Sequence, residues 1–262
     1  MEPDSPGASS ISVGGVLSRT LAVTRTNFRV LCPTLALLFL PSLILGFIAL
    51  GMSPAPSPIS PALALFYFFE SVLGMVLWYV SQGAAIVIAV ESMTGATPEL
   101  GESIRKGLAR LGPLLAVGFI EVLGVGLGML LCFVPGIIVM AAWALAIPIA
   151  VMETRSATES LKRSWELTRG YRVQIFVAVF GLVLLMTAVS FGITIGTVGW
   201  EAFVDPAAAQ TGTPRNWLSV LANYANSVFW GMILSVLAAV FYIDIKNEKE
   251  GVDVATLTSV FE

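Results

Sequence analysis

Histidine is absent from the 262 residues, and charged residues make up only 12% of them. The lack of histidine excludes histidine general bases, serine or cysteine nucleophiles activated by histidine, and histidine metal ligands. The formal net charge of −3 argues against a nucleic-acid partner, because phosphate contacts need a concentrated basic face. We therefore expect no enzymatic activity and no cofactor or metal.

Hydrophobic residues are abundant instead, at 56% of the chain. Six apolar runs are long enough to cross a bilayer as helices, which needs roughly 20 residues. They are apolar on every side, unlike the alternating strands of a membrane barrel. The sequence predicts an all-α integral membrane protein with six transmembrane helices, at 30–50, 62–90, 113–131, 135–152, 173–198 and 217–243.

The distribution of basic residues predicts the orientation. Of the 14 Lys and Arg residues, all except Arg215 lie before the first run, between the second and third, between the fourth and fifth, or after the sixth. The positive-inside rule then places both termini in the cytoplasm. We expect a disordered tail over 1–11, a membrane domain over 12–245 and a cytoplasmic tail over 246–262.

This topology also separates the two cysteines, Cys32 and Cys132. The first lies near the cytoplasmic end of its span and the second near the outer end of another. A disulfide needs Cα atoms about 4.4–6.8 Å apart, far less than the ~30 Å of the hydrocarbon layer. We expect no bond between them.

A short amphipathic segment precedes each pair of apolar runs. LSRTLAVTR (17–25) aligns without gaps with LKRSWELTR (161–169), and IRKGLARLG (104–112) fits more loosely. In the first segment Val13, Leu17, Leu21, Thr24 and Phe28 recur at helical spacing. The second run of each pair ends in an acidic residue, at Glu91, Glu153 and Asp244. We infer a threefold repeat of an interfacial helix followed by a helical hairpin.

The amphipathic segments are expected to lie at the cytoplasmic interface as helices that contact anionic lipid headgroups. A helix that docks a partner protein is the alternative. The residues expected to anchor the interface are Arg19, Arg25, Lys162, Arg163, Trp165 and Arg169.

The segment SATESLKRSWELTRGYRVQIF (156–176), together with a last run that continues into YIDIKNEKEGVD (242–253), resembles a known module. It is similar to the membrane domain that precedes the catalytic domain in some bacterial glycerophosphoryl diester phosphodiesterases, and to related stand-alone bacterial membrane proteins. The resemblance implies a six-helix module of a bacterial inner membrane. It does not imply the hydrolase, whose active site lies in a separate domain and depends on histidines and metal-binding carboxylates.

Two carboxylates, Glu70 and Glu121, fall within the predicted spans. Charged groups are costly there, so each is a candidate functional residue. Glu70 follows an aromatic cluster and is expected at the outer interface. Glu121 is expected near mid-membrane, either protonated or hydrogen-bonded to another helix, and either structural or part of a proton or substrate relay. Its candidate partners are Gln82, Asn223, Asn226 and Ser227.

Small residues and prolines shape the same spans. Gly118, Gly124 and Gly128 share a face with Glu121, which predicts close packing on another helix. Pro41 and Pro148 are expected to permit kinks.

Together these features predict a non-enzymatic membrane protein with a structural, assembly or lipid-interacting role. The alternative is a small transporter or permease subunit that uses Glu121 and the kinked helices. Membrane lipids are the expected partners, and a protein partner or a second copy of the chain stays open.

The predicted orientation can be tested with accessibility labels. Labels at Ser9 and Ser259 are expected to react only from the cytoplasmic side, and a label at Gln210 only from the outside, because of the distribution of Lys and Arg. Any other combination would rule out six crossings with both termini inside.

Overall fold

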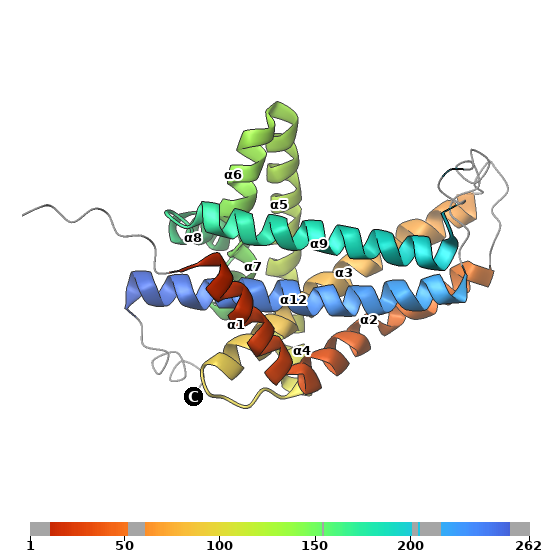
Figure 1. Ribbon diagram of the computed structural model, residues 1–262, viewed down its shortest axis with the longest axis horizontal. Coiled ribbons are helices and arrows are strands. Elements are labelled where there is room, and N and C mark those ends of the chain that lie inside the picture. The colour runs from red at the N-terminus through yellow and green to blue at the C-terminus, as the bar shows by residue number, and fades with distance from the viewer. Residues whose placement is uncertain (1–10, 52–60, 154, 201–203, 205–215, 252–262) are drawn as a thin grey trace, which may run out of the picture.

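The computed structural model describes residues 11–51, 61–153, 155–200, 204 and 216–251. In this part of the chain all regular structure is helical, as Figure 1 shows. The helices are α1 (Val13–Thr26), α2 (Phe28–Gly51), α3 (Pro61–Met93), α4 (Leu100–Ala109), α5 (Leu111–Leu131), α6 (Phe133–Trp143), α7 (Ala146–Met152), α8 (Ala157–Leu167), α9 (Arg172–Val198) and α12 (Trp217–Glu250).

The six predicted apolar spans are present. Six helices are long and apolar enough to cross a membrane: α2, α3, α5, the pair α6 and α7 taken together, α9 and α12. The protein is therefore an all-helical, multi-pass membrane protein. The largest difference in a boundary is at α12, which continues past the predicted end at Ile243 to Glu250, so the predicted tail from 246 begins inside this helix. The predicted tail over 1–11 lies outside the described residues except for Ile11.

The third and fourth spans form a tight hairpin. Cys132 alone separates α5 from α6, and its backbone is extended. The turn therefore precedes Pro135, which lies in the first turn of α6, where its missing N–H costs no helical hydrogen bond. A Cβ atom added to Gly128 would lie 2.8 Å from the Cα of Gly136, so the two helices touch through their backbones.

The glycine face of α5 packs as predicted. A Cβ atom at Gly118 would overlap the ring of Tyr79 on α3, and one at Gly124 would overlap the indole of Trp143 on α6. These glycines thus provide the space for two large aromatic side chains from different helices.

The helix α12 is the centre of the fold and packs on α1, α2, α3 and α9. From Val236 to Ile243 nearly every side chain is buried. A helix that is apolar on all sides must be covered on all sides, whether by protein or by lipid, and here protein supplies the cover.

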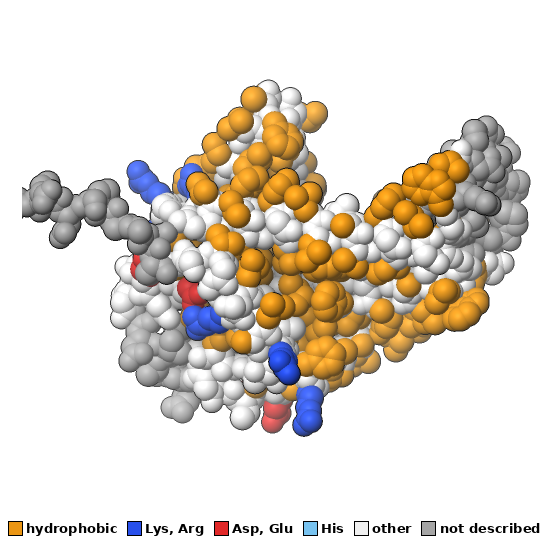
Figure 2. Space-filling model, viewed as in Figure 1, with side chains coloured by type: hydrophobic (Ala, Val, Ile, Leu, Met, Phe, Trp, Pro, Cys, Tyr) orange, Lys and Arg blue, Asp and Glu red, His pale blue; other side chains and the backbone are white. Residues whose placement is uncertain are grey.

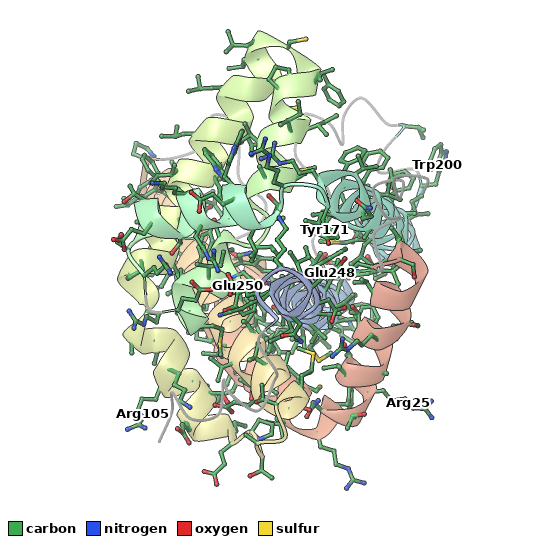
Figure 3. The ribbon with its side chains drawn as sticks, turned by 90° about the vertical axis from the view of Figure 1, so that its left-hand side faces the viewer. Arg25, Arg105, Tyr171, Trp200, Glu248 and Glu250 are labelled. Atoms are coloured by element: carbon green, nitrogen blue, oxygen red, sulfur yellow. The ribbon has the colours of Figure 1, made fainter. Side chains whose placement is uncertain are left out.

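The hairpin of α5 and α6 has a different direction from the rest. The helices α2, α3, α9 and α12 run in one general direction, and the hairpin stands crosswise to them in both Figure 1 and Figure 3. No other helix of the described chain covers the tip of the hairpin, where Leu130 and Leu131 are 85% and 84% exposed. An apolar surface of this kind needs an apolar environment, which a bilayer provides.

The fourth span is broken between Trp143 and Ala146. Pro148 explains the break, because its ring excludes the carbonyl of Ala144, four residues earlier, from a regular helix. The predicted kink at Pro148 is therefore confirmed. By contrast, Pro41 lies inside α2 without interrupting it.

Hydroxyl groups of α8 supply hydrogen bonds at this break. Ser164 and Thr168 donate to the carbonyl of Ala142 at 2.8 and 3.2 Å, and the backbone N–H of Leu145 donates to Ser164 Oγ at 3.2 Å. These buried bonds attach α8 to the broken span, because unpaired backbone groups are costly in an apolar interior.

The helix α1 packs on the protein through only part of the predicted stripe, with Val13, Leu17 and Thr24 facing the core. Val16, Thr20 and Thr24 are its buried residues, whereas Leu21 and Phe28 of the predicted apolar stripe are 61% and 49% exposed. Part of the predicted stripe is therefore turned away from the other helices.

The packing of the α5 glycines leads to a stability prediction. Leu at Gly118 or Gly124 would displace Tyr79 or Trp143 and is expected to cost about 1–3 kcal/mol of unfolding free energy, which is typical of overpacking. The matched control is Gly126→Leu on the same helix, where an added Cβ meets nothing within 4 Å. Unfolding in mixed micelles measures the difference, and equal losses at all three positions would contradict the close approach.

Candidate functional site

Each carboxylate that closes a helical hairpin lies beside a basic residue of a short helix. Glu91 bonds Lys106 of α4 at 2.7 Å, Glu153 lies 3.7 Å from Arg163 of α8, and Asp244 pairs with Arg19 of α1. The three pairs connect the ends of α3, α7 and α12 to α4, α8 and α1. In Figure 2 the visible Lys and Arg side chains lie toward the side of these short helices, away from the apolar tips.

The three basic partners occupy equivalent places in the sequence. Arg19, Lys106 and Arg163 are each the third residue of the segments that start at residues 17, 104 and 161. The fourth residues are small and packed: Thr20 and Ser164 are buried, and a Cβ at Gly107 would lie 3.0 Å from the backbone of α3. The basic residue therefore follows from the same helical register in each segment.

Glu153 is the most heavily bonded of the closing carboxylates. Its Oε1 accepts from Tyr242 at 3.1 Å and Lys246 at 3.2 Å, and its Oε2 accepts from Arg155 at 2.8 Å. Burial raises the pKa of this carboxyl, but the neighbouring Lys246, Arg155 and Arg163 outweigh it and hold the pKa below the ordinary 4.5. Glu153 is therefore ionised at neutral pH.

The end of α12 also holds α8 and the start of α9. Lys249 donates to the carbonyls of Glu166 and Arg169 at 3.2 and 2.7 Å, as a cap on the C-terminal end of α8. Figure 3 shows Tyr171 beside Glu248, with which its hydroxyl forms a hydrogen bond. Sequence reasoning did not identify these contacts as part of a site.

The predicted interfacial anchors divide into two groups. Arg19 and Arg163 are used in ion pairs within the protein. The ring of Trp165 is 41% exposed and lies under the guanidinium of Arg172 at 4.2 Å. The remaining predicted anchors are exposed: Arg25 on α1, Lys162 on α8 and Arg169 just after α8. Arg25 points outward in Figure 3.

A cavity of about 550 Å³ lies between the crosswise hairpin and the helices α9 and α12. Glu121 is the one ionisable residue of its lining, which is otherwise aliphatic and aromatic or glycine. The break between α6 and α7 contributes Ala144 and Leu145 to the same wall. The other lining residues include Val122, Val125, Gly126, Met140, Trp143, Ile175, Phe176, Val179, Leu234, Leu237 and Phe241.

The predicted partners of Glu121 are bonded elsewhere. Gln82 accepts from Ser235 of α12 at 2.8 Å, and Asn226 donates to Ser190 of α9 at 2.9 Å. Asn223 and Ser227 bond to backbone carbonyls of their own helix. Among the described residues, none of the four predicted partners bonds Glu121, because their helices present them to other neighbours. The carboxyl instead faces the apolar cavity.

Glu70 lines a second, smaller cavity of about 260 Å³ between α2, α3 and α12. Ser219, Asn223, Tyr224 and Ser227 of α12 line the same space. The structure thus brings together Glu70 and Asn223, two residues that the sequence identified separately.

Within the described ranges, no group of three or more His, Cys, Asp or Glu side chains is placed to hold a metal ion. Cys32 and Cys132 are both free.

The bonding of Glu153 predicts a pH dependence of stability. A carboxyl with a lowered pKa stabilises the fold above its ordinary value of 4.5 and loses that contribution as the pH falls through the folded pKa. Glu153→Gln is expected to lose about 2 kcal/mol at neutral pH, typical of hydrogen bonds to charged groups. Unfolding measured from about pH 8 to about pH 2.5 would show this difference shrinking below about pH 4.5.

The control for this experiment is Glu102→Gln, which removes an exposed carboxylate that lies 3.0 Å from Lys106 on the same helix. A surface pair of this kind contributes little, so a small effect is expected. An effect as large as that of Glu153→Gln, or a difference that grows on acidification, would contradict the assigned role of Glu153.

Comparison of the chain with known protein families, with characterised proteins and with solved structures gives no match. The resemblance to the membrane domain of glycerophosphoryl diester phosphodiesterases therefore gains no support from these comparisons and stays a prediction.

Proposed function

We propose that this is a non-enzymatic protein of a bacterial inner membrane, with both termini in the cytoplasm, whose role is to bind membrane lipid. The observation that carries the proposal is the apolar cavity of about 550 Å³ between the α5 and α6 hairpin and the helices α9 and α12. Its volume lies within the range of about 300–1,000 Å³ that is typical of small-ligand sites.

The chemistry of the cavity favours an acyl chain. Trp143, Ile175, Leu234 and Phe241 give it an apolar wall, against which an acyl chain makes van der Waals contacts and buries no polar group. Inside a bilayer, lipid tails surround the protein at high concentration. Glu121 adds a single polar group, which suits a chain that carries a hydroxyl, ester or carboxyl group.

The exposed basic residues support the same role. Arg25, Lys162 and Arg169 are free of the ion pairs that hold Arg19 and Arg163, and exposed cations at the inner interface attract anionic headgroups. In this proposal α1, α4 and α8 are interfacial helices, and each begins one unit of a threefold repeat. The equivalent places of Arg19, Lys106 and Arg163 support the repeat.

A transporter or permease subunit is the second candidate. The observation in its favour is that Glu121 shares the cavity with Ala144 and Leu145, at the break in the fourth span, because broken helices and intramembrane carboxylates form many transport sites. Proton movement into liposomes that depends on a solute and disappears in Glu121→Gln would favour this candidate over lipid binding.

Photo-crosslinking tests the lipid proposal. A phospholipid with a diazirine in its acyl chain is expected to label peptides of α5, α6 and α9 in the wild type. Gly126→Phe places a ring in the cavity, since Gly126 lines it and an added Cβ meets nothing within 4 Å. The ring removes space and van der Waals contacts for a bound chain, so labelling of these peptides is expected to fall.

Gly181→Phe is the matched control, because Gly181 of α9 also has nothing within 4 Å of an added Cβ and does not line the cavity. Equal labelling of both variants at the cavity peptides would refute an acyl chain in this cavity.

A further inference from the structure

The smaller cavity contains an ionisable group that pairs with no basic side chain among the residues that the structure describes. Glu70 lies on α3, nine residues after its start at Pro61, and no hydrogen bond or ion pair joins its side chain to any residue of the described ranges. The basic residues of the described chain lie at the opposite ends of the spans. Glu70 is half-buried, so its carboxylate favours a cation in the cavity beside it.

Three of the hydroxyl groups that line the cavity with Glu70 already donate their hydrogens to backbone carbonyls. Tyr224 donates to the carbonyl of Ala36 at 2.7 Å, Ser227 to that of Asn223 at 2.9 Å, and Ser219 to that of Asn216 at 2.8 Å. Each oxygen keeps lone pairs after this donation. Together with the Glu70 carboxylate, these oxygens give the cavity more hydrogen-bond acceptors than donors, since only the hydroxyl of Ser42 and the second side-chain N–H of Asn223 remain as donors among the described side chains of the lining.

Phe39, Leu43 and Val220 form the apolar part of the lining, and Ser42 adds a further hydroxyl group. The cavity of about 260 Å³ is much larger than the share of roughly 30 Å³ that one water takes in the liquid. A bare metal ion would leave most of this space and the apolar wall unused. An organic cation fits better, since its N–H groups meet the acceptors, its charge meets Glu70, and its carbon atoms meet Phe39 and Val220.

We propose that the cavity formed by Glu70, Ser219, Asn223, Tyr224 and Ser227 binds a primary ammonium group. The same chemistry is available from the headgroup of an ethanolamine phospholipid and from a free alkylamine. This site is separate from the acyl-chain cavity, since the two share no lining residue.

The test measures the thermal unfolding of the full chain in nanodiscs. In the first arm, ethylammonium is titrated into phosphatidylcholine discs, with sodium at equal ionic strength as the reference. In the second arm, discs contain phosphatidylethanolamine and no added amine. A ligand that binds only the folded protein raises the unfolding temperature. Stabilisation in the first arm identifies a free amine as a source, and stabilisation in the second identifies the lipid headgroup.

Glu70→Gln removes the charge and keeps the shape, so its apparent Kd for the amine is expected to rise at least about tenfold, as for loss of a charge-assisted bond. Glu70→Asp keeps the charge and is expected to retain binding in part. The control Glu121→Gln removes the carboxyl of the other cavity and is expected to bind the amine as the wild type does.

Ser227→Val tests the site without changing its charge, because it removes one acceptor and keeps Glu70. It is expected to weaken binding relative to the wild type. The proposal is overturned if neither source stabilises the wild type beyond sodium, or if Glu70→Gln and Ser227→Val both bind the amine as tightly as the wild type.

Discussion

The fold depends on the need to pair a carboxylate wherever an apolar helix reaches its charged end. Glu91, Glu153 and Asp244 follow long apolar stretches and are mostly buried, with 17%, 11% and 15% of their side chains exposed. An ion removed from water must find partners, and removal of one partner leaves a costly unpaired charge. The short helices α4, α8 and α1 bring these partners, so the three ion pairs decide where each short helix lies.

The ion pairs also connect the last helix of the described chain to its first helix. Glu91 and Glu153 pair with basic residues that follow them within 15 positions, whereas Asp244 pairs with Arg19, 225 positions earlier. If the chain consists of three units, the acid of each unit meets the base of the next, and the last unit meets the first. This circular order explains why α12 and α1 pack together although they lie at opposite ends of the described chain.

The sequence predicted the features that depend on local composition. Apolar length predicts each span, Pro148 predicts the break in the fourth, and Gly118 and Gly124 predict close packing, because each follows from a few neighbouring residues. The sequence did not predict the partners of Gln82 and Asn226, since these depend on the rotation of α12 about its axis. A rotation of α12 by one residue, about 100°, would point Ser235 and Asn226 at neighbours other than Gln82 and Ser190. The sequence also did not predict the crosswise direction of the α5 and α6 hairpin, because amino-acid composition gives no information about the angle at which helices cross.

The direction of the hairpin does not alter the argument for the orientation of the termini. A helical hairpin that crosses the bilayer twice and one that enters and returns both bring the chain back to its starting side. The distribution of Lys and Arg therefore predicts the same location for both termini in either case. What the crosswise direction changes is the space beside α9 and α12. A hairpin parallel to these helices would pack along their length, whereas a crosswise one meets them over a short stretch and leaves beside it the cavity that Glu121 faces. The feature that composition could not predict is thus the one that creates the candidate lipid site.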